Sequence, residues 1–383
     1  MYLRGAMNLD AASRELRNNF DVLRLAAAAM VLVSHSFVVV GAHEPHVGHF
    51  PLGTLGVEIF FAISGFLVAK SWFGQPRVRA FAVKRGLRIL PALTVTVVAC
   101  AFVLGPVVSE VSSRDYFASS ATYTYSVDND AATATGGVIR DVSHSLPGVF
   151  AGNPDTSVNR SLWTLPIEVQ AYMAIALLGL AGVLSIGLPA LAAGLFALSV
   201  APSGVADLPI VGWPLDWVRG ADGENAHLLA VFALSALMYR YRARIALRVD
   251  LAAIAAIAAV ASLGTPLERA ALVICIPYLA LFVAYRSWAG LRALAARGDV
   301  SYGLYLLAFP VQQTIVHLWG GSLPSPGVVV AIALPVTYLL AFASWHLVEK
   351  RALRLKGALA GRRARRAVPA RATPEPEPAA VQA

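Results

Sequence analysis

Two ionisable residues, Arg24 and His35, lie in the apolar segment FDVLRLAAAAMVLVSHSF. They are eleven positions apart. On an α-helix, with about 100° per residue, both side chains point to nearly the same face, roughly 16 Å apart along the axis. Ionisable groups inside a membrane are costly unless they face protein or water, and they usually serve function there. The pair therefore predicts a functional site within the first span. A structural hydrogen-bonded pair is the alternative.

Two carboxylates also lie in apolar segments. Glu168 follows NRSLWTLPI, and counting from the outer loop places it at about the depth of His35, roughly 9 Å below the surface at 1.5 Å per residue. A carboxylate beside an imidazole orients the ring and raises its basicity. The sequence does not tell whether the two helices touch. Glu58, in GVEIFFAISGFL, lies near the outer end of its segment, where a functional role and a hydrated rim position are equally open.

A basic cluster precedes the third apolar segment, in KSWFGQPRVRAFAVKRGLRILPA. Arg85 and Arg88 are three positions apart and share a helix face, so their guanidinium groups could bind phosphate together. Lys84 lies beside them, and Tyr302 in SYGLYLL is expected at a similar depth. The alternative is that these charges only set topology, and for Arg77 we prefer that explanation.

The composition is that of a membrane protein. Of the 383 residues, 57% are hydrophobic and 14% charged, and the mean hydropathy is +0.65. We predict an all-α, polytopic fold with about ten transmembrane helices. The predicted spans are 20–41, 55–73, 88–105, 162–182, 184–200, 225–240, 250–264, 268–286, 300–319 and 327–348.

The distribution of charge predicts the orientation. Of 31 Lys and Arg residues, 26 fall in the N-terminal region, in alternate loops and in the C-terminal tail. The positive-inside rule then places both termini in the cytoplasm and the loop 106–161 outside. We expect a cytoplasmic arm over 1–19, the membrane domain over 20–348, and a basic, disordered tail over 349–383. The net charge of +9 needs no nucleic-acid partner, because basic loops beside anionic membrane lipid account for it.

The cysteines and the outer histidines predict neither a disulfide nor a metal site. Cys100 and Cys275 each lie within a span and are expected to be packing residues. The run HEPHVGH offers His43, His46 and His49, but the intervening Pro and Gly leave no regular face. No metal is expected.

Five segments over residues 17–348 resemble a known family. In order, they are RNNFDVLRLAAAAMVLVSHS, GVEIFFAISGFL, KRGLRILPAL, NRSLWTLPIEVQAY and SYGLYLLAFPVQQ. Together they resemble the bacterial membrane-bound acyltransferases of family three, which O-acylate surface polysaccharides and related glycans. The chain departs from many members at Ala308, where they carry a histidine before Phe-Pro, so no catalytic role is carried over to that position.

The resemblance implies roles for the charged residues. Arg24 and His35 match the family's Arg-x10-His motif, whose histidine is essential. Arg85 and Arg88 match its Arg-x-x-Arg pair, which the family links to the acyl donor. Glu168 matches the acidic position of its Trp-Ser/Thr-Leu-x-x-Glu stretch. The implied activity is transfer of an acyl group, acetyl by default, from cytoplasmic acyl-CoA to a hydroxyl of an extracytoplasmic glycan or glycosylated acceptor.

This layout predicts a transfer across the bacterial cytoplasmic membrane. Acyl-CoA, as co-substrate, would bind near Arg85, Arg88, Lys84 and Tyr302, and its arm would extend past Arg24. His35 would remove the proton from the acceptor hydroxyl as general base; a covalent acyl-histidine stays open as well. Glu58 and Trp163 are assigned to acceptor binding.

Two other classes compete with an enzyme. A proton-coupled transporter could use His35, Glu58 and Glu168 as a relay, but it leaves the Arg85–Arg88 pair unexplained. A scaffold subunit of a polysaccharide assembly explains neither the ionisable residues in the spans nor the Arg85–Arg88 pair.

Overall fold

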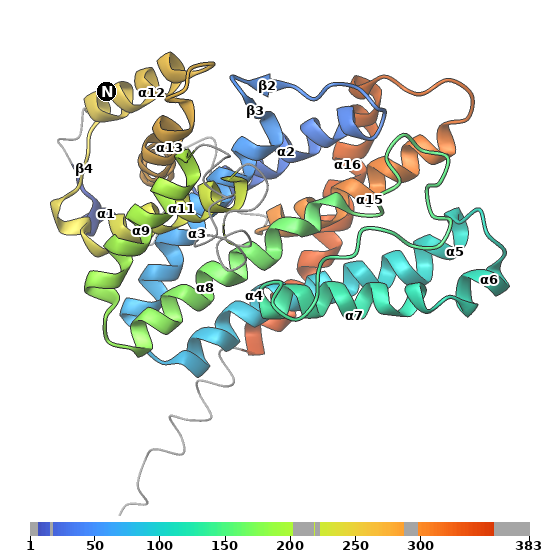
Figure 1. Ribbon diagram of the computed structural model, residues 1–383, viewed down its shortest axis with the longest axis horizontal. Coiled ribbons are helices and arrows are strands. Elements are labelled where there is room, and N and C mark those ends of the chain that lie inside the picture. The colour runs from blue at the N-terminus through green and yellow to red at the C-terminus, as the bar shows by residue number, and fades with distance from the viewer. Residues whose placement is uncertain (1–6, 16–17, 202–217, 219–222, 287–297, 356–383) are drawn as a thin grey trace, which may run out of the picture.

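The computed structural model describes residues 7–15, 18–201, 218, 223–286 and 298–355. The start of the predicted arm and the basic tail beyond residue 355 lie outside the described residues. Within them the protein is mostly helical with two short pairs of strands, which confirms the all-α prediction (Figure 1). Each predicted span overlaps a helix: α2 Phe20–Val38, α3 Leu52–Gly74, α4 Val78–Ala99, α8 Thr164–Leu180, α9 Leu184–Val200, α11 Glu224–Arg240, α12 Val249–Ser262, α13 Glu268–Tyr285, α15 Ser301–Trp319 and α16 Pro326–Ser344.

Several helices are long and apolar enough to cross a membrane. Among the described residues there are 6, and the protein is therefore a multi-pass membrane protein. α9 and α12 are apolar but shorter. The number of ten spans and the orientation of the termini stay predictions. The qualifying segments are Phe20–Val38, Leu52–Gly74, Val78–Val108, Arg160–Leu180, Glu268–Tyr285 and Pro326–Leu355.

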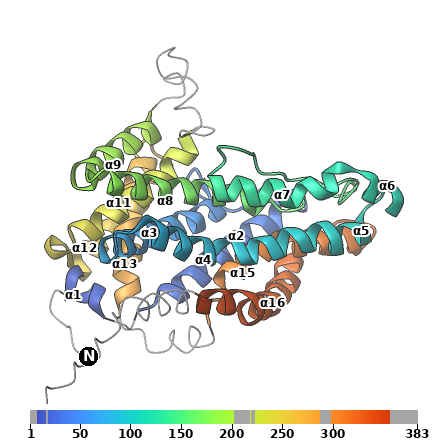
Figure 2. The ribbon, with the colours of Figure 1, turned by 90° about the horizontal axis from the view of Figure 1, so that it is seen from below.

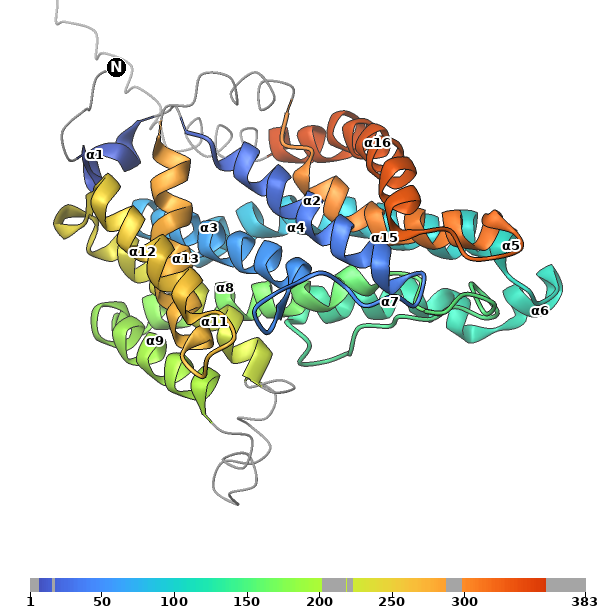
Figure 3. The ribbon, with the colours of Figure 1, turned by 90° about the horizontal axis from the view of Figure 1, so that it is seen from above.

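The core forms around α3, which packs against α2 on one side and α11 on the other. Small residues make both contacts close. A Cβ on Gly65 would lie 2.2 Å from the carbonyl oxygen of Phe232 in α11, and one on Gly56 would lie 2.6 Å from that of Ala27 in α2. Any side chain there would force the helices apart. Next to α2 lie α15 and α16, which pack on it and on each other (Figure 3).

The segment 106–161 is more than a loop. It contains α5 Gly105–Val108, α6 Ser113–Ala118 and α7 Ser120–Thr135. α7 returns alongside α4, where Thr94 donates to Asp130 at 2.9 Å (Figure 2). Its end is held by Gln170 of α8, which donates to the carbonyl of Gly136 at 3.0 Å. One polar side chain of this helix, Asp130, and the backbone at its end thus find partners on neighbouring helices, which hydropathy alone does not indicate.

Short strands tie the ends of helices together. β1 Met7–Asn8 pairs with β4 Ala246–Leu247, beside α1 Leu9–Arg14. β2 His46–Val47 pairs with β3 Phe50–Pro51 just before α3 begins. The latter hairpin directly precedes the first residue of α3, a helix that carries residues of both cavities described below.

Candidate active site

Two cavities lie one after the other between α2, α3, α8 and α15. The first, here called the arginine cavity, has a volume of about 90 Å³. The second, the histidine cavity, has a volume of about 620 Å³. Polar groups of the arginine cavity include Arg24, Ser64, Arg85, Arg88, Glu168, Tyr172 and Tyr302. Those of the histidine cavity include His35, Glu44, Thr54, His144, Asp155, Arg160 and Trp163.

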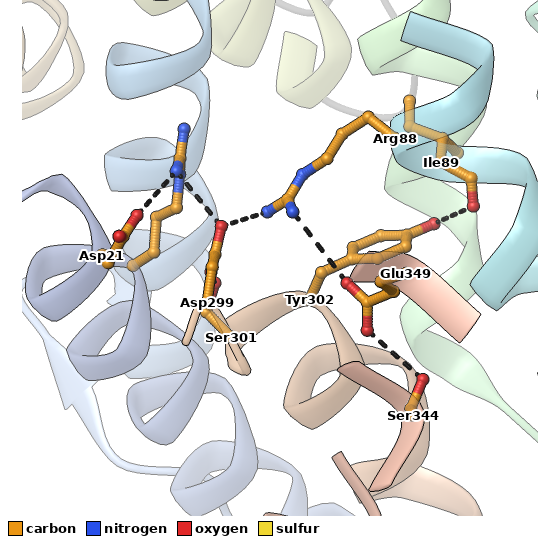
Figure 4. A network of polar contacts seen from close by, with 9 residues as sticks. Asp21, Arg88, Ile89, Asp299, Ser301, Tyr302, Ser344 and Glu349 are labelled. Atoms are coloured by element: carbon orange, nitrogen blue, oxygen red, sulfur yellow. Dashed lines mark hydrogen bonds and ion pairs between the residues drawn. The ribbon is translucent and has the colours of Figure 1, made fainter. Parts of the chain in front are cut away.

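Asp299, just before α15, is the anchor of the arginine cavity. Its carboxylate accepts a hydrogen bond from Arg88 (Figure 4). It also accepts one from Ser301 (2.5 Å), and it lies 3.4 Å from Arg24. Burial would raise the pKa of Asp299, but Arg88 and Arg24 outweigh this and lower it to about 2. A second carboxylate, Asp21, lies 3.3 Å from Arg24. The two arginines are thereby held in fixed positions.

Arg88 is further enclosed by α15 and by the π-helical turn Trp345–Glu349 that follows α16. Its guanidinium lies 3.9 Å from the carboxylate of Glu349, which also accepts from Ser344 (3.2 Å). The ring of Tyr302 lies 5.8 Å from the same guanidinium, and its hydroxyl donates to the carbonyl of Ile89 at 3.0 Å (Figure 4). Tyr302 therefore supports Arg88 from the side.

Arg85 is held differently. Its guanidinium lies over the rings of Phe81 (5.7 Å) and Tyr172 (5.4 Å). Among the described residues it makes no ion pair, and its buried Nε has no hydrogen-bond partner. Lys84 points elsewhere: its ammonium donates to Gln75 at 2.7 Å, and it is not among the residues that line the cavity. Compared with Arg88 and Lys84, Arg85 therefore has the most hydrogen-bonding capacity left to bind an anion.

Glu168 lies in the arginine cavity, not beside His35. It accepts hydrogen bonds from Ser64 (2.7 Å) and from Tyr172. The sequence left open whether Glu168 meets His35, and among the described residues the two line different cavities. The turn before α8 is itself buried: Asn159 and Ser161 are fully buried, and the Asn159 amide donates to the carbonyl of Leu306 in α15.

His35 lines the histidine cavity together with Trp163. Its ring packs edge-on against Phe309 of α15, with centroids 5.1 Å apart. Nδ1 is buried and has no hydrogen-bond partner in the described part of the chain. Asp155 and Arg160, which form an ion pair at 3.1 Å, line the same cavity. An imidazole without a partner on Nδ1 can offer Nε2 either as base or as donor.

Comparison with known proteins now adds to this geometry. The model of one family, described as an acyltransferase domain, matches residues 17–346. The chain belongs to this family. The match confirms the resemblance that the five segments indicated, and the protein is an acyltransferase.

Two curated relatives cover nearly the whole acyltransferase. It is 30% identical over 348 residues to "O-acetyl transferase" of Shigella phage Sf6, covering 88% of this chain and 96% of the relative. It is 28% identical over 382 residues to "Nodulation protein 10" of Rhizobium leguminosarum bv. viciae, covering 91% and 96%. No solved structure matches the chain.

Glu58 of the acyltransferase does not lie at a hydrated rim. It is fully buried, and its carboxylate lies 2.9 Å from Nε2 of His227, which is also fully buried. Phe50 stacks on the His227 ring at 5.0 Å. Glu58 is not among the residues that line either cavity, and its assignment to acceptor binding stays a prediction. Its partner, in ENAHLL at the start of α11, lies 169 positions further along the chain.

Sequence reasoning also missed Asp299 and Glu349. Each is an acidic residue in a region otherwise rich in Lys and Arg, directly before or after an apolar helix. That unusual setting is a signal for an ion pair, although it does not identify the partner. Ala308, where many members of the family have histidine, is buried against Ala28 and Leu32 of α2. It is part of the helix contact, and it lines neither cavity.

Proposed function

We propose that this acyltransferase transfers an acyl group, acetyl by default, from cytoplasmic acyl-CoA to a hydroxyl of a glycan or glycosylated acceptor outside the bacterial cytoplasmic membrane. The observation that carries the proposal is the pair of cavities, one with arginines and one with His35, which share a wall. The orientation rests on the distribution of Lys and Arg, which favours ten spans and cytoplasmic termini. The relative named "O-acetyl transferase" supports the acetyl group and the hydroxyl acceptor.

The donor would use the arginine cavity. Acyl-CoA supplies an activated thioester and several phosphate charges. Three guanidinium groups and the unpartnered Nε of Arg85 fit such an anion, with Arg85 as the first ligand because Arg88 and Arg24 already share Asp299. Sites for whole cofactors usually enclose about 300–1,000 Å³. A volume of about 90 Å³ thus suits only the slender arm of the donor, and the nucleotide with its phosphates would stay at the cytoplasmic mouth, beside these arginines.

The acceptor would use the histidine cavity, whose volume of about 620 Å³ lies within the usual range for a ligand site. Trp163 offers an aromatic surface for a sugar, and Asp155 and Glu44 offer acceptors for its hydroxyl groups. His35 would take the proton of the acceptor hydroxyl, whose oxygen then bonds to the acyl carbon. The carbon–sulfur bond breaks, and the CoA thiolate leaves and regains a proton. General-base catalysis of this kind contributes about 10²–10⁴-fold.

The transporter alternative loses its main support. Its three relay residues lie in three different environments: His35 in one cavity, Glu168 in the other, and Glu58 in a buried pair with His227. A proton relay needs hydrogen-bonded neighbours or water between them. The arginine cavity has no evident use in proton transport.

The test uses purified protein in lipid vesicles with labelled acetyl-CoA. Glycans extracted from a strain that lacks the gene serve as acceptor. We expect label in the glycan, and none when His35 is replaced by Ala. Label on the protein that water or acceptor removes would favour an acyl-histidine step. If monodisperse protein neither consumed the donor nor labelled the glycan, that result would contradict the proposal.

A further inference from the structure

The two cavities meet at one aromatic side chain. Tyr305 of α15 and Val57 of α3 line both cavities. On α8 and the turn before it, the lining changes from one residue to the next: Trp163 faces the histidine cavity, whereas Thr164 faces the arginine cavity. The wall between the cavities is therefore about one side chain thick, and Tyr305 is its largest part.

Tyr305 is held in this position by three contacts. Its hydroxyl donates to the carbonyl of Ser161 at 2.8 Å and lies 2.6 Å from the hydroxyl of Thr164. Its ring meets Phe60 of α3 edge-on, with centroids 5.7 Å apart. The side chain thus bridges α15, α3 and the turn before α8. Because Ser161 and Thr164 already satisfy its hydroxyl, this group is engaged in closing the wall.

An acyl donor that enters by the arginine cavity must pass this wall to reach His35. Along α2, Arg24 and His35 are separated by roughly 16 Å, and Tyr305 lies where the spaces beside them join. A rotation of the Tyr305 side chain would break its hydrogen bonds to Ser161 and Thr164 and leave Val57 as the remaining barrier. Two neutral hydrogen bonds are few enough to break and re-form in each cycle.

We infer that Tyr305 is an internal door between the donor and acceptor sites, an inference that rests on the proposed acyl transfer. When closed it keeps water of the larger cavity away from the thioester. Without it, a water oxygen would bond to the acyl carbon, the carbon–sulfur bond would break, and free carboxylate, CoA thiol and a proton would be released. Tyr305 would thus direct the acyl group to the acceptor instead of to water.

The first experiment tests the wall without requiring activity. Ser64, which lines only the arginine cavity, is replaced by Cys in the natural protein and in a Tyr305→Ala protein. Intact cells are then treated with a membrane-impermeant maleimide from outside. We expect labelling of Ser64→Cys to become at least about tenfold faster when Tyr305 is Ala. Equal rates would overturn the inference.

Two controls make this measurement specific. Thr54→Cys lines the histidine cavity and should be labelled at the same rate whatever residue is at 305. The protein without an added cysteine gives the background from Cys100 and Cys275, which are both buried. If Tyr305→Ala is not monodisperse, Thr164→Val replaces it: it removes one of the two hydrogen bonds at similar volume, and about threefold faster labelling is expected. An unchanged rate in that variant would equally overturn the door.

The second experiment measures how acetyl-CoA is divided between acceptor and water. In Tyr305→Ala, the ratio of hydrolysis to transfer should rise at least about fivefold, and in Tyr305→Phe, which keeps the ring, it should rise less. A merely structural role predicts that both rates fall in parallel, and that result would reject the door. Failure of the proposed function would look different: the natural protein would consume no acetyl-CoA, while the labelling rates would still report on the wall.

Discussion

The arginine cavity and the histidine cavity differ in how their functional groups are held. In the first, Asp299 fixes Arg24 and Arg88, and aromatic rings fix Arg85, around a volume of about 90 Å³. In the second, His35 packs on one ring and has a free Nδ1 in a space of about 620 Å³. Preorganised charge suits a ligand of constant structure, whereas an open, mixed-charge space can receive different acceptors. The difference suggests that specificity for the donor is built into the fold.

The largest effect is expected at His35. His35→Ala should lower transfer about 10²–10⁴-fold, because the general base is lost, while donor binding stays normal. Transfer is measured per mole of monodisperse protein, and donor binding by equilibrium titration with acetyl-CoA. His144→Ala, in the same cavity, is the matched control and should keep most activity. Near-natural activity of His35→Ala would remove the catalytic distinction between the cavities.

Asp299→Asn should come next. It leaves Arg24 and Arg88 without their shared charge partner, which costs about 1–3 kcal/mol of unfolding free energy. Acetyl-CoA should restore part of the lost thermal stability, since its phosphates can replace the carboxylate. The melting temperature with and without donor checks this. Asp250→Asn, which removes the acid of an exposed pair with Arg248, is the control. Equal destabilisation by both changes would mean that the ion pairs of Asp299 stabilise the protein no more than an exposed pair does.

Arg85→Ala should weaken acetyl-CoA binding about 10–100-fold, since a charge-assisted hydrogen bond contributes about 1.5–3 kcal/mol. The variant that lacks both Arg85 and Arg88 should bind acetyl-CoA only slightly more weakly than Arg85→Ala, because Arg88 is already paired with Asp299. Arg77→Ala is the control and should bind donor normally. If the double variant bound acetyl-CoA normally, the phosphate site would have to lie outside this cavity.

Glu168→Gln should lower turnover only a few-fold, because Gln can keep contacts with Ser64 and Tyr172. Since Glu168 lies in the other cavity from His35, the pH dependence of kcat should keep its shape. A shift of the acidic limb of this pH profile would show that the Glu168 carboxylate does act on the His35 imidazole, so that the two cavities are electrostatically coupled.

The smallest effect is expected at Lys84. Its ammonium bonds Gln75 and lies outside the cavity lining, so Lys84→Ala should change donor affinity by less than about twofold. Arg85→Lys, measured beside it, separates the loss of a charge from the loss of a guanidinium. A large loss in Lys84→Ala would extend the donor site towards the loop before α4.

Local pattern was enough for the helices and for the family. Apolar runs predict helical spans because a helix satisfies its own backbone groups, and every predicted run contains a helix. The shared face of Arg85 and Arg88 follows from helical periodicity in the same way, and both line one cavity. The spacing of Arg24 and His35 likewise places them along one helix, although they end in different cavities.

Only the tertiary structure decided which charges meet. Arg88 and Asp299 are 211 positions apart, and Glu58 and His227 are 169 apart, so no local period relates them. The partners of Glu168, which are Ser64 and Tyr172, came from packing, and the place of α7 depended on partners offered by α4 and α8. A helix is set by hydrogen bonds within four residues, whereas its rotation and depth against its neighbours are set by packing of the whole bundle.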